Sequence, residues 1–128
     1  MRFTLLLHYP EPTATDLGPE ALAEGMRAFQ VYADELDRAG ALISADVLQQ
    51  SHATTTVSRV DGELVVQDGP FADTKEQLGG TFVIDVPDLD SAIEWAGRAP
   101  SVVWGHVEIR ATATHYADGA WQGTQPVG

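Results

Sequence analysis

The sequence has 128 residues, 44% hydrophobic and 20% charged, a composition typical of one globular domain with a single core. Its 19 acidic and 7 basic residues give a formal net charge of −12, which argues against nucleic acid and anionic membranes as direct partners, because both are bound by clustered Lys and Arg. Cysteine is absent, which excludes disulfides and thiolate chemistry. With too short an apolar run at its start for a secretory signal, the chain is expected to be cytoplasmic.

The first part of the chain predicts a strand, a long helix and a second strand. Residues 2–9 alternate between two faces, as strand residues do. After a loop over residues 10–18, Pro19 suits the first position of a helix. An apolar stripe, which we expect to lie in the core, follows at steps of three and four: Leu22, Met26, Phe29, Ala33 and Leu36. Gly40 ends this helix in the left-handed conformation, and a strand over 41–48 follows.

The middle of the chain predicts a hairpin and then an irregular loop. Residues 54–60 and 63–67 flank Asp61-Gly62, which is a strong signal for a two-residue hairpin turn. The glycines and proline of residues 68–80 indicate a loop, and residues 81–86 read as a strand.

The last part of the chain predicts a second helix and a final strand. Asp88 is placed to cap a helix with four apolar residues on one face, namely Leu89, Ala92, Ile93 and Ala96. Pro100 ends this helix, and residues 102–111 read as a strand. Residues 112–128 are polar and show no period, so we expect a flexible tail without regular structure.

This order predicts an α+β fold, a ferredoxin-like split βαβ domain over residues 1–111 with an antiparallel sheet, an inserted β-hairpin and both helices on one face. Two sets of side chains in the last strand would then face opposite ways: Val103, Val107 and Ile109 toward the helices, and Trp104, His106, Glu108 and Arg110 away from them. A single chain has nothing left to cover that second face. We therefore expect a homodimer, sheet against sheet, that encloses a cavity.

The run DGPFADTKEQLGG, which begins at Asp68, resembles a known family. With FVIDVPDLDSAIEWA and GHVEIR, it is similar to the DGPF group of YCII-related proteins over about residues 1–111. The resemblance implies a dimeric α+β barrel, as in muconolactone isomerases and small cofactor-free monooxygenases. The wider family includes an enzyme that removes HCl from an aromatic ring. DGPF proteins are often encoded beside extracytoplasmic-function sigma factors, which implies a regulatory setting.

Many YCII sequences have a histidine on the first helix that is proposed to pair with an aspartate. This chain has no histidine between Pro19 and Gly40, so that pair has no direct counterpart here. Asp68 is nevertheless a candidate general base, since it leads from a strand into a Gly-Pro turn where burial would raise its pKa. Its side chain could instead close an Asx turn on nearby amides.

His8 and His106 are the other candidate catalytic residues. The first and last strands of a ferredoxin-like sheet are neighbours, so these imidazoles could shuttle protons or hold an anionic substrate in the dimer cavity. They could equally form hydrogen bonds within the interface. A metal site with Glu108 lacks any motif spacing, and we expect neither a metal nor a cofactor. His52 and His115 are expected to be solvated.

Five more residues are candidates for ligand contacts: Phe71, Thr74, Lys75, Trp104 and Arg110. Lys75, the only lysine, could bind a carboxylate or phenolate, or pair with Asp73 or Glu76. Phe71 either fills the core or stacks on a substrate. Nucleophile-elbow, phosphate-loop and dinucleotide motifs are absent. Two functions stay open: a cofactor-free lyase or isomerase acting on a small, aromatic-type molecule, and a regulatory module that binds a small molecule or a partner protein without catalysis.

Overall fold

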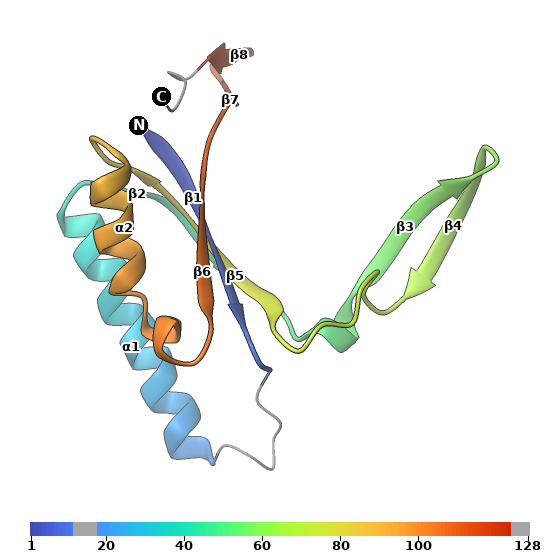
Figure 1. Cartoon of the computed structure of the whole chain (residues 1–128), viewed down its shortest axis with the longest axis horizontal. Helices are drawn as coiled ribbons and strands as arrows, with labels where there is room; N and C mark the ends of the chain where they lie inside the picture. The colour runs from blue at the N-terminus through green and yellow to red at the C-terminus, as the bar shows by residue number, and fades with distance from the viewer. Residues whose placement is uncertain (12–17, 124–128) are drawn as a thin grey trace.

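A computed structural model describes residues 1–11 and 18–123 of the chain. Its main body is a four-stranded sheet with two helices, α1 (Pro19–Arg38) and α2 (Leu89–Gly97), on one face (Figure 1). The sheet has the order β2-β5-β1-β6 and consists of β1 (Arg2–Tyr9), β2 (Leu42–Val47), β5 (Gln77–Asp85) and β6 (His106–Ala111).

Six smaller elements complete the described chain. Two are short 3₁₀ helices, η1 (Ser51–Ala53) and η2 (Pro100–Val103). Four strands form two separate hairpins: β3 (Thr55–Val60) with β4 (Glu63–Asp68), and β7 (Thr114–Ala117) with β8 (Ala120–Gly123). We call the β3–β4 hairpin the arm, because it projects far from the sheet (Figure 1).

The connectivity agrees with the prediction of an α+β fold with an antiparallel sheet and an inserted hairpin. Strands β1 and β2 both run antiparallel to β5, which lies between them, so β1 and β2 are parallel and α1 connects them. Likewise β5 and β6 both run antiparallel to β1 and are connected by α2. Two strand-helix-strand units are therefore interleaved, as a split βαβ arrangement requires. The dimeric barrel remains a prediction.

The core lies between the sheet and the helices. Alternate residues of β1 and β5 point into it, and the two helices supply its other side: Phe3, Leu5, Leu7, Phe82 and Ile84 meet Tyr32, Leu36, Ala92 and Ala96. The Tyr32 ring packs edge-on against Phe82, with centroids 5.2 Å apart, and its hydroxyl donates to the Trp95 carbonyl at 2.7 Å. Burial raises the pKa of Tyr32 to about 12, so the phenol stays neutral.

Both helices bury less of their apolar faces than the sequence predicts. Met26 is 75% exposed and Leu22 is also exposed, so the first half of the stripe does not lie in the core. The reason is length: 20 residues give about 30 Å of helix, and the N-terminal turns of α1 extend past α2 and η2 (Figure 1). On α2, Leu89 and Ile93 are exposed as well, and only the small residues of that face are buried.

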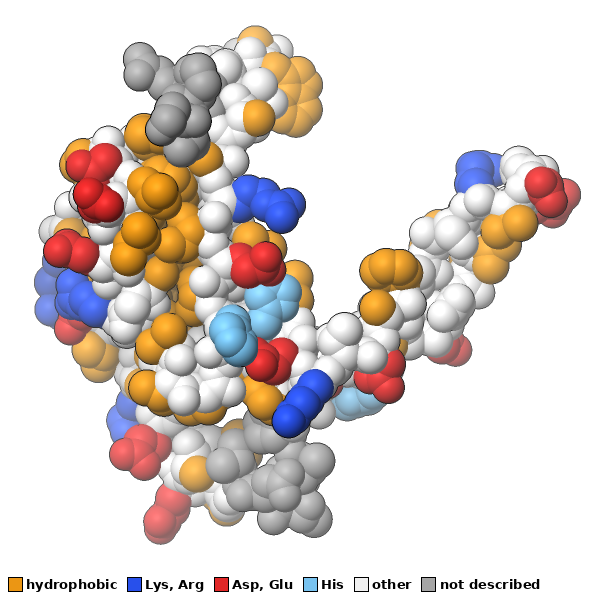
Figure 2. Space-filling view, in the orientation of Figure 1, with side chains coloured by type: hydrophobic (Ala, Val, Ile, Leu, Met, Phe, Trp, Pro, Cys, Tyr) orange, Lys and Arg blue, Asp and Glu red, His pale blue; other side chains and the backbone are white. Residues whose placement is uncertain are grey.

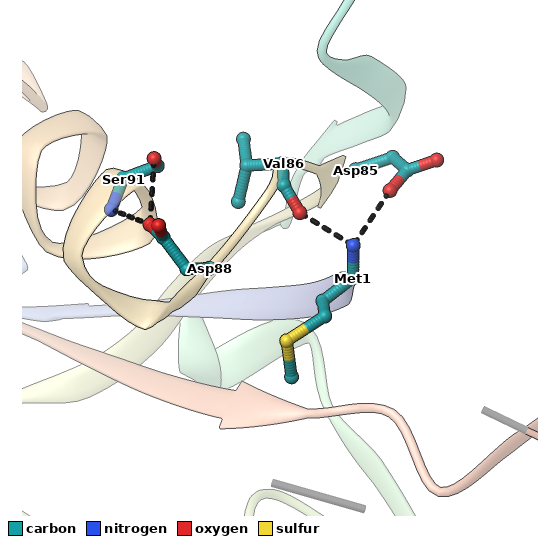
Figure 3. Close-up of polar contacts among 5 residues, drawn as sticks. All are labelled: Met1, Asp85, Val86, Asp88 and Ser91. Atoms are coloured by element: carbon teal, nitrogen blue, oxygen red, sulfur yellow. Dashed lines mark hydrogen bonds and ion pairs between the residues drawn. The ribbon is translucent and has the colours of Figure 1, made fainter. Parts of the chain in front are cut away.

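The start of α2 follows the prediction. The Asp88 Oδ1 atom accepts hydrogen bonds from the Ser91 backbone N–H and hydroxyl, both at 2.8 Å (Figure 3). These bonds lower the pKa of Asp88. On the same side of the sheet, the Met1 amino group donates to the Asp85 carboxylate at 3.1 Å and to the Val86 carbonyl (Figure 3).

The last strand begins later than expected, at His106 rather than residue 102. Residues 100–103 form η2, which leaves Val103 82% exposed instead of facing the helices. Val107 and Ile109 pack against the core as predicted. The turn between η2 and β6 passes so close to β1 that a Cβ at Gly105 would overlap the His8 carbonyl oxygen.

Both hairpins turn on an Asp-Gly pair with positive φ, the geometry of a type I′ turn. Asp61 and Gly62 have φ of 52° and 80°, which confirms the predicted arm turn. Asp118 and Gly119 have φ of 53° and 78°. The β7–β8 hairpin corrects our expectation that residues 112–128 lack regular structure; residues 124–128 lie outside the described ranges. No helix of the described chain is long and apolar enough to cross a membrane.

Candidate functional site

The sheet face opposite the helices is the open face, and the strand register places most of its side chains in three rows. Cross-strand partners share a face, so each row runs from β6 across β1 and β5, and two rows continue to β2. The first row is His106, His8 and Leu78; the second is Glu108, Leu6, Thr81 and Asp46; the third is Arg110, Thr4, Val83 and Ser44. Histidine, acidic and basic side chains gather on this side of the sheet (Figure 2).

The first histidine–carboxylate pair joins β1 to β6. The Nε2 atom of His8 lies 2.6 Å from Oε1 of Glu108, at ion-pair distance. This Nε2 atom is buried and makes no hydrogen bond of normal geometry within the described chain, so its contact with Glu108 is a close approach of the two groups rather than an aligned hydrogen bond. The His8 side chain is 27% exposed, whereas Glu108 is well exposed.

The second pair joins β6 to the start of β5. The Nδ1 atom of His106 lies 2.7 Å from Oε1 of Glu76. The hydrogen bond to Glu76, together with its negative charge, raises the pKa of His106. His106 is therefore protonated to a higher pH than a free histidine. Nothing in the sequence pointed to this role for Glu76, because 30 residues and an irregular loop separate it from His106.

The loop before β5 orders itself around Thr74. Its hydroxyl donates to the Glu76 carbonyl at 2.7 Å, and its own carbonyl accepts from the Gln77 side chain at 3.1 Å. Lys75 is exposed and forms no ion pair with any described residue, so neither expected pairing, with Asp73 or with Glu76, is formed. Its ammonium is free to meet a ligand.

The other candidates of this region lie away from the two histidine pairs. Asp68 is the last residue of β4, opposite Thr55, and is exposed on the arm. Its side chain makes no hydrogen bond to a described residue, so the Asx turn is not formed there, and no contact joins it to His8 or His106. Phe71 is 86% exposed, so the expectation that it fills the core is wrong.

Trp104 and Arg110 differ in their surroundings. Trp104 follows η2 rather than lying on β6, and its ring meets Tyr9 edge-on at a centroid distance of 5.0 Å. Tyr9 crosses Gly79 so closely that a Cβ there would overlap its ring. Burial and the nearby Glu11 charge raise the pKa of Tyr9. Arg110 is exposed on the open face, without an ion pair in the described part of the chain.

The two remaining histidines do not join this cluster. His52 is exposed in η1 as expected, but His115 is partly buried, and its Nδ1 atom has no hydrogen-bond partner among residues 1–11 and 18–123. Over those same ranges, no three His, Asp or Glu side chains lie close enough together to hold a metal ion. The described open face thus offers two imidazole–carboxylate pairs and, on the same strand as His106 and Glu108, the guanidinium of Arg110.

Comparison with known proteins places the chain in a family. Residues 1–113 match the model of the YCII-related domain. An uncharacterized protein of Rhizobium meliloti (strain 1021) is 33% identical over 119 residues, which cover 90% of this chain and 94% of that protein. The family match includes β1 and β6, the strands that bear His8, His106 and Glu108. The chain belongs to the YCII-related domain family.

Proposed function

We propose that two copies of the chain pack open face to open face as a dimeric α+β barrel, and that the enclosed chamber transfers protons on a small, anionic, aromatic-type molecule without a cofactor. The observation that supports this function is the pairing of His8 with Glu108 and of His106 with Glu76 on one uncovered sheet face. At His106 the Glu76 carboxylate stabilises the protonated imidazole, which suits a group that accepts and returns a proton near neutral pH.

Two properties of the surface favour a second copy as the cover. Leu6 and Val83 lie on the open face among its polar groups, and no element of the described chain covers them. A compact monomer of 13.7 kDa exposes about 6,600 Å², whereas this chain exposes 8875 Å². Even half of that excess exceeds the ~800 Å² that each partner buries in a standard interface.

The proposed chemistry is an isomerisation or an elimination. His8 or His106 would take a proton from a substrate carbon as a neutral imidazole. In an isomerisation the resulting imidazolium returns the proton to another carbon, and in an elimination the electron pair expels a leaving group such as chloride. Arg110 would offset a substrate carboxylate or phenolate. Neither the isomerisation nor the elimination requires an oxidant. Asp68 would join the site only if the arm of a partner brought it there.

The test uses benzoate as a small aromatic carboxylate and follows the histidine side chains by NMR. Benzoate should shift the resonances of His8 and His106, and an Arg110→Gln variant should bind it at least tenfold more weakly because the guanidinium is lost. Arg59→Gln is the matched control, since Arg59 lies on the arm, where its guanidinium donates to the Gly62 carbonyl. Absence of histidine shifts at millimolar benzoate, or equal weakening by both variants, would refute the proposed site.

The second candidate is a regulatory module that binds a small molecule or a partner protein without turning anything over. The exposed Phe71 ring and the exposed apolar residues of the arm favour it, because such surfaces commonly mark interaction sites. Residues 68–71 also match the DGPF signature, and we assign the chain to that subgroup as part of this proposal. A cytoplasmic setting suits both candidates. Tight binding of a ligand with no product over hours would favour the module over the enzyme.

A further inference from the structure

The arm has apolar side chains on both of its faces and nothing within the described chain to cover them. Its two strands pair with each other and with no other described strand (Figure 1). Five of its residues are 38–61% exposed: Val57, Val60, Leu64, Val65 and Val66. The register places Val57, Leu64 and Val66 on one face. An isolated two-stranded hairpin is at best marginally stable in water, so an arm of this composition needs a partner.

The base of the arm is nevertheless held firmly. The Glu11 carboxylate accepts hydrogen bonds from both the backbone N–H of Ser51, at 2.5 Å, and its hydroxyl, which ties the end of β1 to η1. The other side of the base is closed by a bond from the Gly69 N–H to the Thr54 carbonyl, at 2.7 Å. Thr56 adds a bond from its hydroxyl to the Gly69 carbonyl at 2.8 Å. The bonds of Glu11 hold η1 beside the end of β1, and the bonds of Gly69 hold the two strands of the arm together at its base. The position at which the arm leaves the sheet is therefore defined by hydrogen bonds.

We infer that the arm is a clasp that packs its apolar face against a second copy of this chain. The inference rests on the proposed dimer and adds a second contact region to it, outside the open face. The chain exposes 8875 Å², which is about 2,300 Å² more than a compact monomer of its mass. An excess of this size is comparable to the area that one protomer buries in an obligate homodimer, and the arm contributes to it. No strand of its own sheet pairs with the arm in the described chain.

The same chain also offers places where a clasp can attach. Strands β2 and β6 each have one neighbour in the described sheet, so each leaves one edge of backbone donors and acceptors unpaired. Such edges are templates for the addition of strands. On β2, the exposed side chains of Ile43 and Val47 lie beside that edge and provide an apolar surface. A six-residue strand reaches about 20 Å, enough to lie along the edge of a neighbouring copy.

The experiment compares dimer dissociation in variants that change valine to threonine, which keeps the branched shape and the strand preference. Val57→Thr with Val66→Thr should raise the dimer dissociation constant at least tenfold in sedimentation equilibrium. Val103→Thr, on η2 and 82% exposed, is the control outside the arm and should leave it within twofold. A dissociation constant unchanged by the double variant, or weakened equally by the control, overturns the clasp while leaving the open-face dimer intact. A wild-type chain that stays monomeric overturns both.

Hydrogen exchange on the wild-type protein keeps the test informative if the double variant fails to fold. The amides of Thr55–Asp68 should become protected as the protein concentration rises through the dissociation constant. The amides of the β7–β8 hairpin, which has the same Asp-Gly turn and shorter strands, should exchange at a rate independent of concentration. If the arm amides exchange equally fast in monomer and dimer, the clasp is contradicted. The apolar surface of the arm would then be a binding site for a different protein.

Discussion

Two glycines beside Tyr9 allow a test of how the end of β1 packs. A methyl group at Gly79 would lie 2.6 Å from Cε1 of the Tyr9 ring and nearer still to Cζ and the hydroxyl oxygen. A methyl group at Gly105 would overlap the His8 carbonyl oxygen and lie 3.0 Å from the Tyr9 Cα atom. Carbon atoms in ordinary contact are about 3.5–4.0 Å apart. Both substitutions therefore overpack, but one meets a side chain and the other meets backbone.

Whether the new methyl group meets a side chain or backbone determines how much each substitution should change the free energy of unfolding. Gly79→Ala should lower the free energy of unfolding by about 1–3 kcal/mol, as overpacking does. Gly105→Ala should cost at least as much, since the His8 carbonyl can move only with its strand. In a Tyr9→Ala background the obstacle at Gly79 is gone, and alanine then gains about 0.5–1 kcal/mol over glycine in a strand. The coupling between positions 79 and 9 should therefore be about 2 kcal/mol, within the range for residues in contact.

Urea unfolding followed by circular dichroism, at one fixed protein concentration, measures these energies. The Tyr9→Ala background should rescue Gly79→Ala and fail to rescue Gly105→Ala, because the second methyl group still meets the backbone. A coupling below about 0.5 kcal/mol between positions 79 and 9, or equal rescue at both glycines, would refute the packing described for the Tyr9 ring.

Three further predictions concern the core, the site and a helix cap. Leu36→Ala, at the fully buried C-terminal end of the α1 stripe, should cost about 2–5 kcal/mol, and Met26→Ala about 0.5 kcal/mol or less; similar urea midpoints would contradict the difference in burial between the two ends of the stripe. Glu76→Gln should lower the pKa of His106 toward its usual ~6.5 in an NMR titration, and an unchanged pKa would deny the pair. Since the folded pKa of His106 is raised, its stabilisation is full below about pH 6.5 and disappears as pH rises through the folded value. Asp88→Ala should lower the Tm above about pH 4, and this difference should vanish as pH falls through the lowered folded pKa of Asp88; a Tm difference that persists at pH 2 would contradict the capping role.

The fold was predictable where a short sequence pattern favoured the same local structure that the packing of the whole chain requires. The alternation in residues 2–9 identified the face of β1 that is buried, and Asp61-Gly62 identified the arm turn. Asp88, a residue type that favours the N-cap position, correctly predicted the start of α2. The extent of burial along α1 was not predictable, since an apolar stripe shows which face of a helix is apolar but not how much sheet lies beneath it. Met26 is exposed for that reason.

The missed hairpin and the missed glutamate have different causes. Asp118-Gly119 is the same dipeptide as the arm turn, so the β7–β8 hairpin had a visible signal; its four-residue strands were too short to show alternation. The neighbouring positions of His8 and His106 followed from the strand order, and the register pairs them directly. Their use in catalysis remains a prediction. Glu76 had no signal, because its loop has no period and only the folded chain brings it to His106.

The separation of the arm from the core has a consequence for how this chain can change over generations. Residues that share no contacts usually contribute to stability independently, so substitutions at the tip of the arm leave the energetics of the helix-backed sheet almost untouched. Insertions and deletions are tolerated best at such exposed tips. Among relatives, we therefore expect the length and sequence of the arm to vary far more than the sequence of the core beneath α1 and α2. The arm can change in this way without any change in the core.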